Sequence, residues 1–212
     1  MNPLRCVFLL QFATALALGQ AVDNGKPASL SNEPEALVRS LYAQVVVRHP
    51  IGIPRETDVR IYAPYLSSAL QHRIELARAC ARDWDRTHPD PRDRTRPDPN
   101  LKPEMDWLEL GIFSGRSEEA APQAFEIEKT ESEKDGSFRV YVRMTWEWPP
   151  APKLVWTVAA IVVREGVHLV VDDIDYLTDK SGDENALSRL SEALSAGCDG
   201  PRWVGWPRPD QR

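Results

Sequence analysis

The segment FRVYVRMTWEW, residues 138–148, decides the fold class because its side chains alternate along the chain. Apolar residues fall on every second position, and mostly polar or charged residues occupy the positions between them. A period of two is typical of a β-strand that buries one face against a core. The segment therefore predicts an amphipathic strand whose apolar face is covered by other elements.

The surrounding sequence extends this strand into an antiparallel meander of about four strands. The pairs Asp135-Gly136 and Glu165-Gly166 mark tight turns between strands. The prolines after the second strand end it, because proline cannot donate a ladder hydrogen bond. The predicted strands are residues 124–130, 138–148, 154–163 and 167–174.

Two helices are predicted ahead of the sheet. Asn32 is a candidate N-cap for the first helix, at residues 33–48, and the second runs from Ala63 or Tyr65 to Thr87. Both carry apolar residues every three or four positions. A short helix at residues 184–196 follows the sheet. The fold class is thus α+β: N-terminal helices packed on a curved antiparallel sheet, with a short C-terminal helix. The helix stripes should contact the face of Val140, Val142, Met144, Trp146 and Trp148, with Arg139, Arg143 and Glu147 on the other face.

The N-terminus has the composition of a secretory signal peptide. Arg5 gives a positive start, and an apolar run of about 13 residues follows, which is too short for a bilayer span of about 20. Small residues end the run and offer a cleavage site. We therefore expect a secreted or periplasmic protein with no membrane span after cleavage. The predicted organisation is a signal peptide at 1–21, a mobile leader at 22–31, one α+β domain at 32–197 with a Pro/Arg-rich surface loop at 88–103, and a Trp/Pro-rich tail at 198–212.

Export determines which cysteines remain in the mature protein and whether they can form a disulfide. Cys6 leaves with the signal peptide, so Cys80 and Cys198 remain. Two cysteines in an oxidising compartment often pair, and we predict a disulfide between them. It would place the end of the last helix against the middle of the second helix.

Composition excludes several functions. Lys and Arg number 26 against 32 Asp and Glu, for a net charge of −6, which is a poor match to nucleic acid. The chain has no phosphate loop, dinucleotide fingerprint, nucleophile elbow or zinc-type spacing of His and Cys. We therefore expect no cofactor and no metal.

Three short motifs resemble a known superfamily: residues 37–42, YLSSAL at 65–70 and VVDDIDY at 170–176. They are similar to the nuclear transport factor 2-like superfamily, the cone fold of a ketosteroid isomerase, and to a secreted bacterial family of unknown function within it. The resemblance covers about residues 33–177 and leaves the Pro-rich segment and the tail unexplained. It implies a pocket between sheet and helices. Its relatives include polyketide cyclases, dehydratases and catalytically silent ligand-binding domains, so it does not separate enzyme from binder.

The candidate site follows from these features. Asp172 or Asp173 could act as a general base if its carboxylate enters an apolar cavity. Strict alternation puts Asp173 on the face of Val171, and Asp172 on the face of Ile174. The candidate ligand-pocket residues are Tyr42, Tyr65, Trp146 and Trp148.

Three functions stay open. The leading hypothesis is a module, rather than an enzyme, that binds a small apolar ligand or a protein partner and has an apolar pocket between its curved sheet and its helices. The first alternative is a small isomerase or dehydratase with an aspartate base. The second is a stoichiometric inhibitor or envelope interaction protein that uses the tail or the Pro/Arg loop. A homodimer is left open.

The first prediction concerns export. The mature protein should begin near Gln20 or Val22, because small residues occupy the positions that signal peptidase reads. N-terminal sequencing of the exported protein measures this. An intact Met1 on a soluble cytoplasmic species would contradict it.

Overall fold

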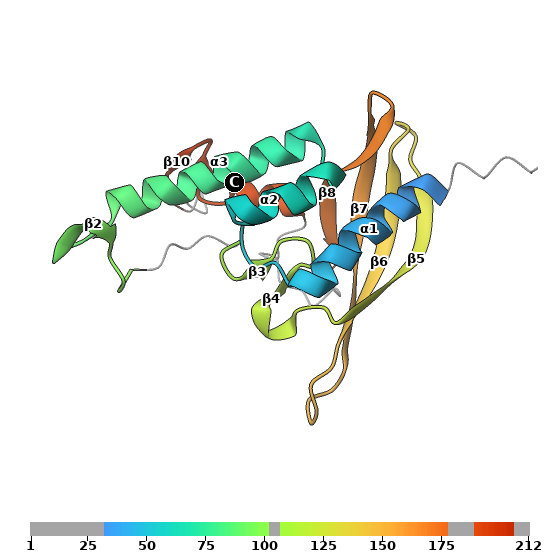
Figure 1. The fold of residues 1–212 in the computed structure, drawn as a ribbon, viewed down its shortest axis with the longest axis horizontal. Helices are drawn as coiled ribbons and strands as arrows, with labels where there is room; N and C mark the ends of the chain where they lie inside the picture. The colour runs from blue at the N-terminus through green and yellow to red at the C-terminus, as the bar shows by residue number, and fades with distance from the viewer. Residues whose placement is uncertain (1–31, 102–106, 178–188, 206–212) are drawn as a thin grey trace, which may run out of the picture.

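Figure 1 shows the computed structural model, which describes residues 32–101, 107–177 and 189–205. This part of the chain is α+β: helices come first, a four-stranded antiparallel sheet follows, and a short helix and a small hairpin end it. The predicted fold class is therefore confirmed at this level. The predicted signal peptide and leader lie outside the described residues.

The sheet is the predicted meander. Its strands pair in the order β5-β6-β7-β8, with each antiparallel to the next. The turn before β6 is the predicted Asp135-Gly136 hairpin, where Gly136 has φ +85° and the Ser137 hydroxyl donates to the Asp135 carboxylate at 2.7 Å. The strands are β5 (Ala124–Ser132), β6 (Phe138–Trp146), β7 (Leu154–Glu165) and β8 (His168–Leu177).

Strand β6 is shorter than predicted. Its last pair joins Trp146 to Leu154, and the prolines that follow leave no further ladder. Trp148 lies beyond this pair and is 67% exposed. The prediction that Trp148 packs against the helices is wrong for this reason.

The helix α1 (Asn32–Arg48) forms as predicted and crosses the sheet (Figure 1). Its Leu41 and Val45 are buried in one core with the apolar face of β6. Val140, Val142 and Met144 on that face are fully buried, which confirms the predicted packing.

The second helical region differs from the prediction of one helix. It contains α2 (Glu56–Tyr62), the 3-10 turn η1 (Ala63–Tyr65) and α3 (Ser68–Thr87). The break occurs because Ser67 adopts an extended backbone and caps α3, where its Oγ accepts from the Leu70 N–H at 2.9 Å.

The described part of the Pro/Arg-rich segment, residues 88–101, is mostly on the surface as expected, but it is not simply a loop. The strands β1 (Pro89–Asp90) and β2 (Asp93–Pro97) pair into a hairpin at the far end of α3 (Figure 1). Asp90 stabilises the turn, because its carboxylate accepts from the Arg92 N–H at 2.8 Å.

The short elements between this hairpin and β5 are β3 (Leu110–Gly111), β4 (Arg116–Ser117) and η2 (Glu118–Ala120).

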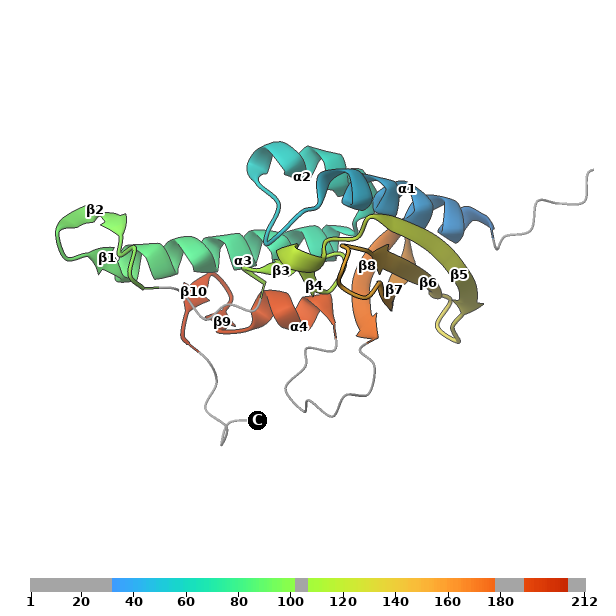
Figure 2. The same ribbon diagram turned by 90° about the horizontal axis from the view of Figure 1, so that it is seen from below.

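The C-terminal elements pack on α3. The helix α4 (Leu190–Ser195) occupies part of the predicted 184–196 helix, whose residues 184–188 lie outside the described residues. Figure 2 shows α2 and α4 flanking α3 on two different sides. The described start of the tail forms a hairpin from β9 (Cys198–Asp199) and β10 (Arg202–Trp203).

The predicted disulfide is present. Cys80 of α3 and Cys198 of β9 are bonded, with their Cα atoms 6.0 Å apart. A second contact holds the same hairpin, because the Trp203 N–H donates to the Asp83 carboxylate at 3.0 Å. The start of the tail is thus fixed to the middle of α3, where the sequence placed it.

The second prediction concerns this cross-link, which joins residues separated by 118 positions. Cys198→Ser removes the bond and retains the buried Cys80 sulfur. Because such a long loop is then free in the unfolded chain, the free energy of unfolding should fall by about 3–5 kcal/mol. Urea unfolding measures the loss. Oxidised wild-type protein and wild-type protein in reductant are the controls, and the variant should match the reduced sample. Equal midpoints for variant and oxidised protein would contradict the prediction.

Candidate functional site

A bulge in β8 decides where its aspartates point. Ile161 of β7 pairs with Asp173, but the next residue, Val162, pairs with Val171, so Asp172 is an extra residue in the strand. As a result Val171 and Ile174 both lie in the core, although strict alternation predicted opposite faces for them. Asp173 and Asp175 share the other face of the sheet with Arg139.

Asp172 connects β8 to the start of α3. The Ser67 Oγ donates to its carboxylate at 2.6 Å, and the Ser67 N–H donates to the Val171 carbonyl at 2.8 Å. Because the same Ser67 Oγ accepts from Leu70, one serine joins the helix cap to the strand bulge.

Asp173 connects β8 to the start of α4. Its carboxylate accepts from the Ser191 N–H at 3.0 Å, from the Ser191 Oγ at 2.6 Å and from the Ile174 N–H at 2.9 Å. The residue is 6% exposed, so these bonds replace water around a buried charge. Asp173 therefore orients the first turn of α4.

Asp175 completes the same face with two ion pairs. Its Oδ2 lies 2.5 Å from the Arg139 Nη1, and its Oδ1 lies 3.0 Å from the Arg189 Nη2. The second contact is an ion pair that lacks the alignment of a hydrogen bond. The described contacts of all three aspartates join structural elements, and the catalytic assignment of Asp172 and Asp173 stays a prediction.

The predicted pocket residues do not gather in one cavity. Tyr42 is fully buried and its hydroxyl donates to the Phe113 carbonyl at 2.9 Å. Burial raises the pKa of this hydroxyl far above its usual value. Tyr65 and Trp146 are half-buried at the edge of the core, and Trp148 is exposed. Fully buried side chains from α1 and β6 close the space between helix and sheet, where the sequence led us to expect a pocket.

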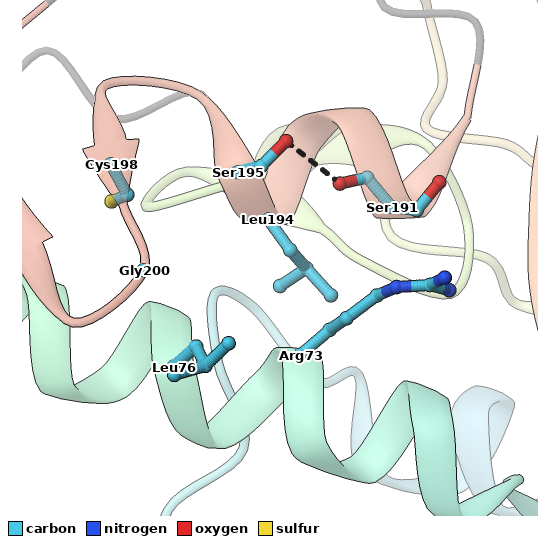
Figure 3. A pocket seen from close by; sticks show the side chains of 7 residues that line it. All are labelled: Arg73, Leu76, Ser191, Leu194, Ser195, Cys198 and Gly200. Carbon is cyan, nitrogen blue, oxygen red and sulfur yellow. Dashed lines mark hydrogen bonds between the residues drawn. The ribbon is translucent and has the colours of Figure 1, made fainter.

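A pocket of about 210 Å³ lies instead between α3 and α4 (Figure 3). Figure 3 shows Leu194 of α4 directed toward α3 beside Leu76, and Arg73 extended toward the end of α4 that carries Ser191. The lining residues are Arg73 and Leu76 from α3, Ser191, Leu194 and Ser195 from α4, and Cys198 and Gly200 from the tail.

The polar groups of this pocket differ in whether they already have hydrogen-bond partners. The Ser191 hydroxyl donates to Asp173, and the Ser195 hydroxyl donates to carbonyls of its own helix. Arg73 is exposed, and within the described residues no hydrogen bond or ion pair occupies its guanidinium. The pocket therefore offers apolar walls and one free cationic donor.

The sequence did not single out Arg73, Leu76 or Leu194. The cavity exists only because α4 is brought against α3, which the alternation and turn patterns do not encode. One usable signal was present, since the predicted Cys80–Cys198 bond already placed the last helix beside the second. Leu76 and Arg73 lie one and two turns before Cys80, on the face of α3 that the disulfide turns toward the last helix.

Comparisons add no assignment: no family model, no curated protein and no solved structure matches this chain. Across the described ranges, no helix is long and apolar enough to cross a bilayer. The same ranges contain no group of three or more His, Cys, Asp or Glu side chains that could hold a metal ion.

The third prediction concerns the Asp175 ion pairs. Asp175→Asn should lower the free energy of unfolding by about 2–3 kcal/mol, because it removes the buried carboxylate charge that Arg139 and Arg189 share. Arg139 then keeps only Glu133 at 3.2 Å, and Arg189 only Asp173 at 3.9 Å. The loss stays below that of a fully buried pair, since the Arg139 and Arg189 side chains are 27% and 44% exposed. The matched control is Glu126→Gln, which breaks the exposed 3.3 Å pair with Arg143 and should cost at most about 1 kcal/mol. Urea unfolding measures both. Equal losses of unfolding free energy in the two variants would show that the Asp175 ion pairs contribute no more than an exposed ion pair does.

Proposed function

We propose that the protein is a secreted or periplasmic module that binds a small, largely apolar ligand in the pocket between α3 and α4. The observation that carries the proposal is an apolar cavity with a free arginine at its side. The Cys80–Cys198 disulfide is consistent with an oxidising compartment. The nuclear transport factor 2-like resemblance stays a proposal and is not needed for this assignment.

The size and chemistry of the pocket limit the ligand. A volume of about 210 Å³ is below the roughly 300–1,000 Å³ of pockets for drug-sized molecules, so a short chain or a single ring is the better fit. Leu76 and Leu194 supply apolar contact, where each buried methylene contributes about 0.8 kcal/mol. Arg73 favours an anionic or hydrogen-bond-accepting end. A short amphiphilic acid combines these properties.

The walls of the pocket are fixed before a ligand arrives. The Cys80–Cys198 bond holds one end of the α4 segment, and the Ser191–Asp173 hydrogen bonds hold the other. Because the two walls need not be ordered on binding, more of the contact energy appears as affinity.

A protein-interaction role is a second candidate, and one observation favours it. At the end of the sheet between β6 and β7, the apolar residues Trp148, Leu154 and Val155 are 67%, 38% and 37% exposed. Exposed apolar residues that lie close together favour a contact with another molecule. The described start of the tail, residues 198–205, is less suited to this role, since Trp203 is half-buried and its ring lies against Gly197.

The fourth prediction tests the α3–α4 pocket with octanoate as the probe. Wild-type protein should bind it saturably, and Leu76→Trp should remove the binding that belongs to this pocket, because the indole fills the cavity. Arg73→Gln should weaken binding about tenfold, since it removes a charge-assisted contact. The matched control is Arg82→Gln, an exposed arginine of the same helix that does not line the pocket. Titration calorimetry measures all four proteins. Equal binding by wild type and Leu76→Trp would reject this site.

A further inference from the structure

Three tyrosines are buried in the described chain, and one of them differs from the others. The Tyr42 hydroxyl donates to the Phe113 carbonyl at 2.9 Å, and the Tyr176 hydroxyl donates to the Ile112 carbonyl at 2.7 Å. Tyr62 is only 1% exposed, yet its hydroxyl has no hydrogen-bond partner among the described residues. Leaving a buried polar group unpaired is costly, and an ion or ligand that completes it is a standard explanation.

Tyr62 lines a polar cleft of about 560 Å³. The cleft lies between the C-terminal end of α1, the connecting segment 49–55 and α2. Its charged lining residues are Arg48, Arg55 and Asp58, and His49 lies beside them. Valine, isoleucine and proline side chains form the rest of the wall. This volume falls within the range of small-molecule sites.

Two charged residues of the cleft act on the Tyr62 hydroxyl. Burial raises the pKa of its hydroxyl to about 12, while nearby Arg48 lowers it and nearby Asp58 raises it. The hydroxyl is therefore protonated at neutral pH and available as a donor. Tyr62 also borders a smaller cavity of about 140 Å³, where the Gln71 amide already donates to the carbonyls of Ala63 and Leu66. His72 and Glu75 also line that smaller cavity, and Glu75 is paired with Arg78. The charged cleft is the better source of a partner for the hydroxyl, because Arg48 and Asp58, the charges that act on its pKa, line that cleft.

The wall of the cleft is rigid. The Gly52 N–H donates to the Leu110 carbonyl at 2.9 Å, and the Arg78 guanidinium of α3 donates to the Pro54 carbonyl at 2.7 Å. Gly52 has φ +66°, and a side chain there would press on the Leu108 carbonyl. These bonds fix the segment that carries Arg55 before any ligand binds, which reduces the ordering cost of binding.

We propose that this cleft is a second binding site, which takes the oxyanion group of a small molecule. Arg48 and Arg55 supply positive charge and planar donors suited to carboxylate and phosphate oxygens, and the Tyr62 hydroxyl supplies a third donor. Asp58 offsets one of the two positive charges, which favours a singly charged group. The site does not depend on the α3–α4 pocket, since the two share no lining residue.

Acetate and inorganic phosphate, titrated at constant ionic strength, test this site and separate its two chemical sources. Saturable changes in the amide NMR signals of the 49–58 segment are expected. Tighter binding of acetate identifies a carboxylate ligand, and tighter binding of phosphate identifies a phosphate ester. Tyr62→Phe and Arg55→Gln should each weaken binding about tenfold. The control Arg60→Gln, an exposed residue of the same helix outside the cleft, should bind as wild type does.

Stability without added anion gives an independent check. Tyr62→Phe should leave the unfolding midpoint unchanged or raise it, because no hydrogen bond is lost. Tyr42→Phe and Tyr176→Phe should lower the midpoint, because each leaves a buried carbonyl unpaired. The proposal is overturned if neither anion saturates the cleft signals, or if Tyr62→Phe is as destabilising as the other two variants. Octanoate binding at Arg73 is measured separately, so failure at one site is distinct from failure at the other.

Discussion

Hydrogen bonds from two serines to the aspartates of β8 set how the helical layer attaches to the sheet. Ser67 joins Asp172 to the start of α3, and Ser191 joins Asp173 to the start of α4. Both aspartates are available because the bulge frees one residue from the regular ladder and directs the next away from the core. The helices are thus positioned by polar bonds of defined direction, whereas apolar burial alone would allow sliding.

The long helix α3 is then held at more than one point. Its start is bonded to β8, and its middle is bonded to the tail through the Cys80–Cys198 disulfide. Arg78 extends from the same helix to the Pro54 carbonyl and fixes the segment ahead of α2. The two cavities for which we propose ligands therefore have walls that depend on α3, one through α4 and the other through Arg78. Rigid walls of this kind favour binding over collapse of the cavity.

Features that depend on local pattern could be predicted from the sequence. The α1 stripe, the period-two run of β6 and the Asp135-Gly136 turn formed as expected, because periodicity and turn chemistry act over a few residues. The break between η1 and α3 was missed because the apolar stripe continues through Leu66 to Leu70 across it. The faces of the aspartates were misassigned because one extra residue in β8 reverses all later alternation.

The same reasoning explains why the candidate sites lie among the helices and not beneath the sheet. Leu41 and Val45 of α1 meet Val142 and its neighbours on β6 in a core whose members are almost completely buried, so the sheet keeps no apolar surface for a ligand there. The helices α2, α3 and α4 also bury side chains in this core, Ile74 and Leu190 among them. The candidate pockets lie at the margins of this packing, where half-buried and exposed residues form most of their walls. Arg73 lies at such a margin, whereas Tyr62 borders a cavity while its ring packs on Phe113 inside the core. The sequence could not assign a role to either residue, because that role depends on which elements the tertiary structure places beside it.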